Sequence, residues 1–343
     1  MKRAAILKTM LVVLLLNNAI VSAQTSLKQK YFFSDTSMIP VTFSTDMGNL
    51  TSGKIKEGKQ PGQFTGTFEG QKYTGKVIVN TRGKMRKTIC FVPPLKIDFL
   101  KDSGSFWKPL KTLKLVSPCE SSAMYEQLLV KEYLVYKLYN VLTDISFRVR
   151  LMLITYEDEK GKKKPITQYA FFLEDEDQMA KRNECISIEN NKYLTDATDF
   201  NQITLTCIFE YMIGNTDWSV PNNHNIRLIR SKKDSFAKPI AVPYDFDYSG
   251  IVNAPYATPD PELEIQYVTQ RLYRGFPRTM AQLEPIVQKF KDKKSDLLAV
   301  INDCVFLKAN EKKEMISYME EFYKLIDKPS SVKTIFIDRA RTQ

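Results

Sequence analysis

Apolar residues follow two different periods along the chain, and the change of period predicts its elements. From 40 to about 116, short segments alternate apolar and polar side chains, as in residues 76–79. A period of two that is broken by glycines is typical of β-strands joined by turns. Over 122–142 the apolar residues fall at helical spacing, with Ser121 or Ser122 available as the N-cap. We therefore expect a β-rich segment followed directly by one long helix.

A strand-like hairpin closes the first half of the chain. Residues 148–156 and 167–173 flank a polar turn, and the second of these segments runs into the acidic residues 174–177. We place a domain boundary there, with a β-rich N-terminal lobe over 24–175 and a mainly helical lobe over 176–343. This division fits a mature chain that is longer than a typical single domain.

Helix signals are clear in the second half of the chain. Asp199 is placed to cap a helix whose apolar positions end at Gly214, a typical helix-stopping residue. A polar loop over 215–225 follows this helix. The remaining expected elements are a β-hairpin over 226–244 and amphipathic helices over 280–290 and 311–326.

Residues 1–23 have the composition of a signal peptide. Basic residues precede an apolar run over 10–16, and residues 21–23 form a small-residue cleavage site before Gln24. The apolar run is too short to span a bilayer as a stable helix, and no cysteine follows the cleavage point to carry a lipid. The alternative to a signal peptide is a short membrane anchor. No later segment is apolar enough to cross a membrane. We therefore expect an exported protein of the periplasm, the cell envelope or the extracellular space.

The net charge is positive, but it does not indicate a nucleic-acid partner. The formal charge is +11, and removal of the three basic residues of the signal peptide leaves +8. Basic runs at 162–164 and 291–294 are typical of solvated faces and would also suit an acidic substrate or an anionic surface. No stretch interleaves basic and aromatic residues in the pattern of a nucleic-acid-binding protein.

Five cysteines in an exported chain leave at least one of them unpaired. None shows the close C-x-x-C spacing of a metal site, so metal binding by cysteine is not expected. Cys90 and Cys119 each flank a strand-like segment, and an oxidising compartment would allow a disulfide there.

The loop over 214–225 concentrates polar chemistry between a buried helix and a strand. It holds Asp217, four asparagines and the only histidine of the chain, His224. The hairpin that follows should return the chain beside this loop and deliver Asp245 and Asp247. Oxygen-bearing groups that converge in this way suit a hard cation such as Mg²⁺ or Mn²⁺. The alternative is structural, because Asn and Asp also cluster in turns that they stabilise themselves.

Two segments resemble motifs of known kinases. Residues 209–217, with the core Ile-Gly-Asn-Thr-Asp, are similar to the catalytic loop of HipA-type toxin kinases and CotH-type spore-coat kinases. Residues 242–247 resemble the metal-binding turn of the same families. By this resemblance Asp217 orients or deprotonates the acceptor hydroxyl, while Asn225 and Asp245 hold the metal that bridges the nucleotide phosphates.

The resemblance covers roughly residues 80 to 250 and also implies a fold. The order of β-rich segment, long helix, hairpin, helix, acidic loop and second hairpin is the layout of a protein kinase. We therefore expect an α+β, two-lobed protein-kinase-like fold. Its N-lobe would be β-rich with one long helix, and its C-lobe would be mainly helical.

Upstream residues complete the expected nucleotide site. Lys114 and Glu132 resemble the strand lysine and helix glutamate that pair over the phosphates in kinases, so both are candidate catalytic residues. Glu132 lies on or beside the apolar stripe of its helix, where a buried carboxylate needs a cation such as Lys114. The alternative is that Glu132 sits at the edge of the stripe and reaches water. We expect Lys114, Arg82 and Glu174 to contact the nucleotide.

The sequence departs from the kinase pattern in three places. No G-x-G-x-x-G loop is present in the N-terminal half, so phosphate contacts would fall to the basic turn over 82–86. The metal-binding amide normally follows the catalytic Asp by five residues, which would select Asn222, but Asn225 lies immediately before the strand and is preferred. Whether Asp245 or Asp247 is the principal metal ligand stays open.

These residues support three functional hypotheses. The first is an exported, atypical CotH-like kinase, a phosphotransferase that moves the γ-phosphate of ATP or another nucleotide to a protein or glycan hydroxyl. The second is a catalytically inactive kinase-like binding protein of the envelope, which would have no chemical need for so complete a set of residues. The third treats Asp245 and Asp247 as the paired carboxylates of a glycoside hydrolase, which requires a defined separation across a sugar.

Overall fold

The computed structural model describes residues 32–33, 37–51, 59–68, 70–83, 90–188 and 193–341. The expected signal peptide over 1–23 lies outside the described residues. The chain divides into two compact units, one formed by residues up to 117 together with 150–172, the other by 118–149 together with 173–343. The chain therefore passes three times between the units, and the third passage, between 172 and 173, lies close to the boundary expected near 175.

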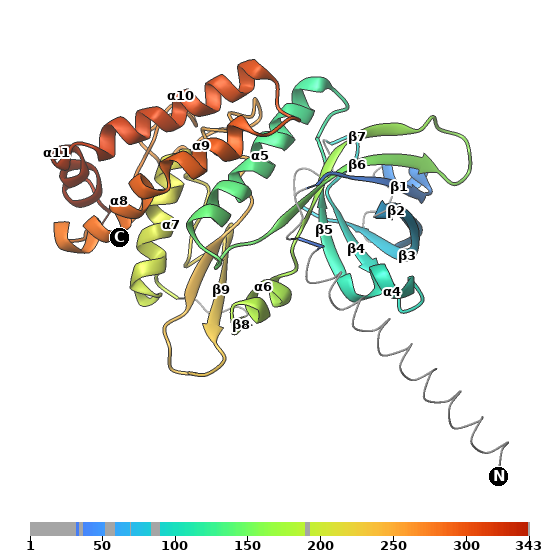
Figure 1. Cartoon of the computed structure of the whole chain (residues 1–343), viewed down its shortest axis with the longest axis horizontal. Helices are drawn as coiled ribbons and strands as arrows, with labels where there is room; N and C mark the ends of the chain where they lie inside the picture. Colours follow the sequence, from blue (N-terminus) through green and yellow to red (C-terminus); the bar gives the residue numbers. More distant parts are fainter. Residues whose placement is uncertain are drawn as a thin grey trace, which may run out of the picture. The chain divides into compact units, whose positions relative to one another are not determined.

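The first unit is a closed barrel of seven strands (Figure 1). The strands are β1 (Ile39–Thr45), β2 (Gln60–Phe68), β3 (Gln71–Thr81), β4 (Leu95–Phe99), β5 (Thr112–Val116), β6 (Val149–Asp158) and β7 (Ile166–Leu173). Their order around the barrel is β1-β2-β3-β4-β5-β7-β6. The parallel pairing of β1 with β6, from Ile39 opposite Met152 to Thr45 opposite Asp158, closes it. Short helices α2 (Met47–Thr51), α4 (Gly104–Trp107) and η1 (Lys108–Leu110) lie between the strands in the sequence.

The expected two-lobed protein-kinase-like fold is wrong. The β-rich segment closes into a seven-stranded barrel, and the second unit adds a three-stranded sheet to its helices. Alternation of apolar and polar residues predicts that strands exist, but it does not specify which strands pair. Here β1 finds its partner β6 more than a hundred residues away. The long helix expected in the first lobe also belongs to the second unit.

Aromatic side chains fill the barrel. In β1 alternate residues are buried, as a period of two requires. Phe43 stacks on Phe64 with ring centroids 4.6 Å apart, and Phe99 stacks on Trp107 at 5.3 Å. Gly75 on β3 lies directly against Trp107, and a Cβ at this position would come within 2.7 Å of the indole ring. The indole therefore occupies the space that a side chain at position 75 would need.

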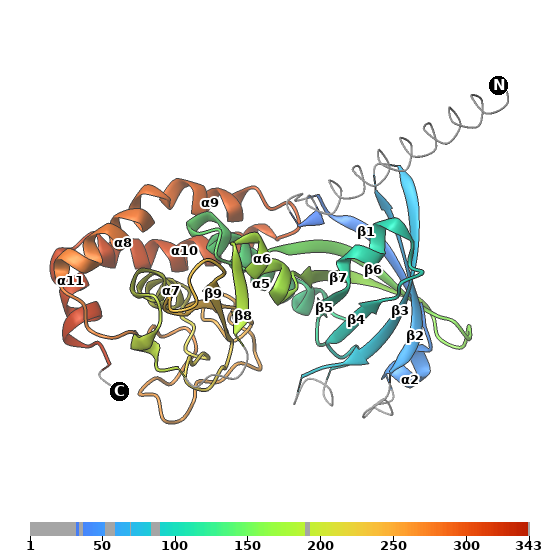
Figure 2. The same cartoon turned by 90° about the horizontal axis from the view of Figure 1, so that it is seen from below.

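The second unit combines helices with a small sheet. Its helices are α5 (Ala123–Leu142), α6 (Glu176–Arg182), α7 (Phe200–Ile213), α8 (Met280–Asp292), α9 (Lys294–Asn302), α10 (Ala309–Ile326) and α11 (Pro329–Lys333), with short turns η2 (Thr195–Ala197) and η3 (Thr334–Asp338). The sheet has the order β10-β9-β8, from Ile240–Pro243, Ile226–Ser231 and Cys185–Ile188. Figure 2 shows α8, α9 and α10 together on one side of this unit and the sheet on the other.

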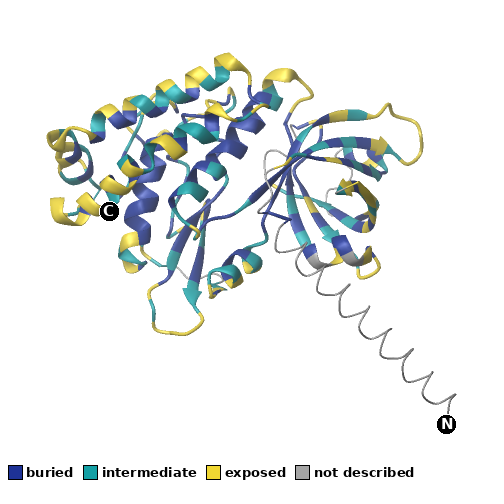
Figure 3. Ribbon diagram, in the orientation of Figure 1, coloured by how far each residue is buried: buried dark blue, intermediate teal, exposed yellow. Residues whose placement is uncertain are grey.

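The two central helices form where local signals predicted them. Ser122 caps α5 by accepting a hydrogen bond from the backbone N–H of Tyr125, and Asp199 caps α7 by accepting one from Gln202. Helix α7 is buried over nearly its whole length (Figure 3) and packs against β10, α8 and α10. Gly214 ends α7 with φ of 68°. Because a Cβ there would collide with the Tyr318 hydroxyl, only glycine fits both the backbone and the space.

Two further expectations concern the membrane and the cysteines. Within the described residues, the helices are either too short or too polar to cross a bilayer. Cys90 and Cys119 are each disulfide-bonded, as expected, while Cys185, Cys207 and Cys304 are free thiols.

The contact between Gly75 and Trp107 yields the first prediction. Gly75→Ala forces the indole or the strand to move, so we expect the free energy of unfolding to fall by about 1–3 kcal/mol, the usual cost of overpacking a core. Urea denaturation measures this loss. The exposed neighbour Lys72, changed to Ala, is the control and should stay within about 0.5 kcal/mol of wild type. Equal stability of the two variants would show that the barrel does not depend on this contact.

Candidate functional site

The polar loop after α7 is closed by its own backbone. Ser219 and His224 exchange two backbone hydrogen bonds of 2.9 and 3.0 Å across the loop. At its start, the backbone N–H of Asp217 donates to the Asn215 side-chain oxygen at 3.0 Å. These bonds fix Asp217 between the end of α7 and the start of β9.

Two neighbouring side chains hold the Asp217 carboxylate. The Nε2 atom of His224 lies 2.8 Å from Oδ1, and the Nδ2 atom of Asn225 donates to Oδ2 at 2.9 Å. Each carboxylate oxygen therefore has its own partner. The Asp217 side chain is still 37% exposed. Its carboxylate is thus held in one orientation while part of it faces solvent.

Asn225 links the loop to the following hairpin. Its amide nitrogen donates both to the Asp217 carboxylate and, at 2.7 Å, to the Asp217 main-chain oxygen. Its own main-chain oxygen accepts from the backbone N–H of Tyr244 at 3.0 Å. Because the amide nitrogen is fully used, the amide oxygen is left to face another partner. Asn222, the alternative amide, is exposed on the loop surface.

The turn after β10 carries Asp245 and Asp247 to the same end of the hairpin. Strand β10 pairs with β9 so that Pro243 lies opposite Ile226, which places the residue after Tyr244 next to Asn225. The backbone N–H of Asp245 donates to the Tyr136 hydroxyl at 2.8 Å. Asp247 is buried, and one of its carboxylate oxygens accepts from the Tyr256 hydroxyl at 3.2 Å.

Phe246 anchors this turn between two helices. Its ring meets Tyr136 of α5 edge to face at 4.7 Å and Phe209 of α7 at 5.8 Å. Phe246 is itself fully buried, while Asp245 on one side of it is partly exposed and Asp247 on the other is buried. The turn is therefore positioned by helices α5 and α7, the two elements that the sequence predicts best.

Strained backbone gathers at this site. Left-handed φ values are uncommon outside glycine. Among the described non-glycine residues, six have positive φ, and three of these are Asn223 (48°), Asn225 (52°) and Asp245 (65°). Such residues concentrate at functional sites because the surrounding structure must compensate for their conformation.

The three residues expected to hold a divalent cation lie at this end of the hairpin. Asn225 contributes an amide oxygen, and Asp245 and Asp247 contribute carboxylates. In the described part of the chain, no group of three or more His, Cys, Asp or Glu side chains is arranged to hold a metal. Metal binding by this set of two carboxylates and one amide stays a prediction.

A buried acid lies beneath the loop. Glu210 of α7 is buried, and neither of its carboxylate oxygens accepts a hydrogen bond from a described residue. Its pKa is raised to about 8, chiefly by burial and also by the nearby charge of Asp217, while the Asn215 side chain and Arg274 act in the opposite direction. Glu210 is therefore largely protonated at neutral pH.

Arg274 also supports the loop. Its guanidinium donates to the main-chain oxygens of Thr216 and Trp218, the latter at 3.0 Å. These two carbonyls flank Asp217 in the sequence. Arg274 thus fixes the backbone on both sides of the candidate catalytic carboxylate.

The structure brings together only part of the predicted site. Asp217, Asn225, Asp245 and Asp247 lie on connected segments of the second unit. Glu174 belongs to the same unit, but its carboxylate accepts from the Arg182 guanidinium at 2.9 and 3.1 Å and from the backbone N–H of Arg148. Its predicted contact with nucleotide stays a prediction.

The other predicted residues are divided between the units. Lys114 on β5 and Arg82 after β3 belong to the barrel, while Glu132 on α5 belongs to the second unit. Glu132 is buried, so the alternative in which it reaches water is wrong. Its pairing with Lys114 stays a prediction. Of the basic turn over 82–86, residues 84–86 lie outside the described residues.

Sequence reasoning missed three participants. His224 is the only histidine, but its spacing of seven residues from Asp217 does not indicate their contact. Glu210 could have been recognised from the sequence, since it is an acid inside an apolar helix. Arg274 is distant in sequence and has no local signal.

Known proteins do not add to this picture. The models of known protein families give no match to the chain, and a search of curated proteins gives none either.

The buried acid yields the second prediction. Glu210 has a folded-state pKa of about 8 against an ordinary 4.5, so unfolding releases a proton between these values and stability falls as pH rises through this window. Glu210→Gln is neutral at every pH. We therefore expect its stability relative to wild type to rise by up to about 1.4 kcal/mol per pH unit between pH 5 and 8, and to stay constant below pH 4.5.

Urea denaturation at a series of pH values tests this expectation. The exposed Glu284, changed to Gln, is the control and should show a difference from wild type that barely depends on pH. A constant difference for Glu210→Gln across the same range would show that Glu210 is ionised in the folded protein.

Proposed function

We propose that this protein is an exported phosphotransferase that moves the γ-phosphate of ATP or another nucleotide to a protein or glycan hydroxyl with Mg²⁺ or Mn²⁺. One observation carries the proposal. A half-exposed carboxylate, Asp217, is oriented by His224 and Asn225, and Asn225 also joins it to the turn that holds Asp245 and Asp247. A candidate base and a candidate metal site therefore share one residue.

Asp217 is the proposed group for the acceptor hydroxyl. A carboxylate accepts hydrogen bonds through both oxygens, and each oxygen keeps a further lone pair after bonding to His224 or Asn225. A hydroxyl that approaches from the solvent side can donate to one of these lone pairs. Asp217 would then orient the hydroxyl and take its proton as the bond to phosphorus forms.

Asn225, Asp245 and Asp247 are the proposed metal ligands. A bound divalent cation would offset the negative charge of the nucleotide phosphates. The Asn225 amide nitrogen is already committed to Asp217, so its oxygen points away from that bond. Rotation of the amide would break two hydrogen bonds, which holds the oxygen in place for a cation.

The resemblance of residues 209–217 and 242–247 to CotH-type and HipA-type kinases supports the same chemistry at the level of motifs. A kinase-like fold is no part of the proposal. The signal-peptide composition of residues 1–23 supports export.

The different roles of two aspartates yield the third prediction. Asp217→Ala should leave nucleotide and metal affinity nearly unchanged and lower phosphate transfer by roughly 10²–10⁴-fold, because a base acts mainly in the transition state. Asp245→Ala should abolish the metal-dependent part of nucleotide affinity. Calorimetry with a non-hydrolysable nucleotide and transfer of labelled γ-phosphate to an envelope extract measure the two quantities.

The exposed Asp303, changed to Ala, is the control and should match wild type in both assays. If wild type binds nucleotide but transfers phosphate neither to any acceptor nor to water, the protein is a binding protein of the envelope. If it binds no nucleotide with either cation, the proposed phosphotransfer is wrong.

A further inference from the structure

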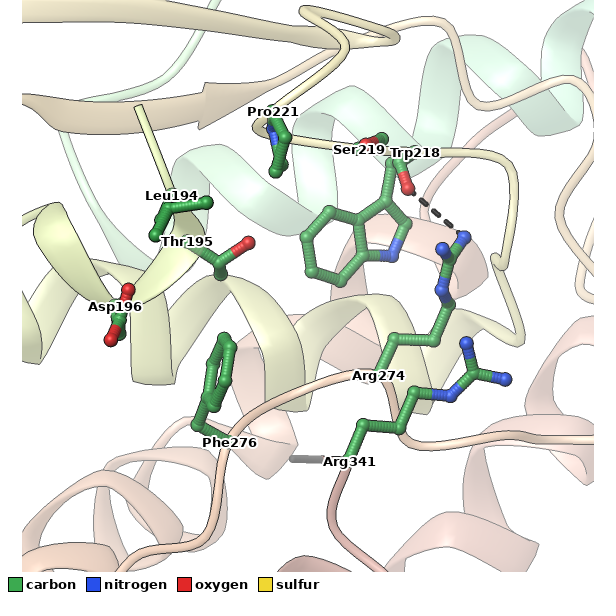
Figure 4. Close-up of a pocket in the computed structure, with 9 residues that line it drawn as sticks. All are labelled: Leu194, Thr195, Asp196, Trp218, Ser219, Pro221, Arg274, Phe276 and Arg341. Atoms are coloured by element: carbon green, nitrogen blue, oxygen red, sulfur yellow. Dashed lines mark hydrogen bonds between the residues drawn. The ribbon is translucent and has the colours of Figure 1, made fainter. Parts of the chain in front are cut away.

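A pocket of about 300 Å³ opens beside the loop of Asp217 (Figure 4). It lies wholly in the second unit and is lined by four segments: η2 with its preceding residue, the Asp217 loop, and the irregular chain near residues 275 and 341. The lining residues are Leu194, Thr195, Asp196, Trp218, Ser219, Pro221, Arg274, Phe276 and Arg341. This volume is at the small end for ligand pockets.

The pocket shares a wall with the candidate active site. Trp218 directly follows Asp217 and is buried, with its indole ring forming part of the lining. Arg274 lines the pocket and also holds the carbonyls on either side of Asp217. The pocket wall therefore includes the residue next to Asp217 in the sequence and the arginine that holds the backbone on both sides of Asp217.

Two guanidinium groups meet at one end of the pocket. Figure 4 shows Arg341 beside Arg274. The pKa of Arg274 is lowered first by burial and then by the positive charge of Arg341, so the two cations interact unfavourably. Within the described residues, no carboxylate forms an ion pair with Arg341. An anion placed between them would relieve the repulsion and gain charge-assisted hydrogen bonds.

The rest of the pocket combines apolar surface with the hydroxyl residues Thr195 and Ser219 and one acid on the far wall. Trp218 and Phe276 present aromatic surface, and Leu194 remains 63% exposed at the edge. The Trp218 indole N–H is buried and donates to no described residue. Asp196 lies across the pocket from the arginines in Figure 4. Its charge disfavours a compact polyanion and favours a ligand that also carries N–H donors.

We propose that this pocket binds the acceptor, and that the acceptor is a peptide segment with a carboxylate side chain and an apolar residue beside the phosphorylated hydroxyl. This inference rests on the proposed phosphotransfer, because only a phosphotransferase has an acceptor. The carboxylate pairs with Arg341 and the free face of Arg274, the apolar side chain packs on Trp218 and Phe276, and backbone N–H groups face Asp196. A neutral glycan would leave the two arginines without an anion.

Binding of matched peptides tests the inference without requiring turnover. The probes are acetyl-Ser-Phe-Glu-amide and its Gln counterpart, which differ only in charge. The protein is labelled with 5-fluorotryptophan, which gives one fluorine signal each for Trp107 and Trp218. We expect the Glu peptide to shift the Trp218 signal and leave the Trp107 signal unchanged, with about 10–100-fold tighter binding than the Gln peptide.

Arg341→Gln should remove most of this preference. Arg339→Gln is the matched control, since Arg339 is an exposed arginine two residues away that does not line the pocket. The inference would be overturned by equal affinities for the two peptides or by a preference for the Glu peptide that survives in Arg341→Gln. It would also be overturned if the Trp218 signal responded to a neutral oligosaccharide and to neither peptide. Phosphate transfer without any preference for the Glu peptide would overturn it while leaving the proposed phosphotransfer intact.

Discussion

The candidate site depends on the side chain of Asn225. Its amide nitrogen donates to the carboxylate and to the main-chain oxygen of Asp217, and its main-chain oxygen accepts from Tyr244 at the end of the hairpin. These bonds join the loop after α7 to the turn after β10, which are also joined by backbone hydrogen bonds from Gly250 to Gly214 and from Ile251 to Ile213. Asn225 adopts a left-handed backbone conformation with φ of 52°, which the two sets of bonds must maintain.

The packing below the site maintains this arrangement. Phe246 fixes the acidic turn against α5 and α7, and Arg274 fixes the backbone on both sides of Asp217. Glu210 lies beneath the same loop as a buried acid whose pKa is raised to about 8. The site is therefore built on a rigid helix pair, while its reactive groups lie on segments that a ligand can reach. The pocket at Trp218 extends this surface along the loop.

The sequence predicts those features that depend on neighbours in the chain. Helices α5 and α7 follow from capping residues Ser122 and Asp199 and from apolar spacing, and the hairpin of β9 and β10 follows from its polar turn. The barrel does not follow, because the pairing of β1 with β6 joins segments more than a hundred residues apart. The same limit hides Arg274 and Arg341, which reach the loop from distant segments. The sequence names Asp217, Asn225, Asp245 and Asp247, whose roles stay predictions, whereas the contact of His224 with Asp217 needs three-dimensional geometry.

We propose that a divalent cation binds between Asn225 and Asp245, next to the Asp217–His224 contact. Because His224 is the only histidine, its imidazole C–H groups give the only histidine signals in a proton spectrum of the untagged protein. Mn²⁺ is paramagnetic and broadens the signals of nearby nuclei. We expect Mn²⁺ well below one equivalent to broaden the His224 signals, Mg²⁺ to compete with this effect, and Asp245→Ala to abolish it. His224 signals that stay sharp in wild type at saturating Mn²⁺ would contradict the account.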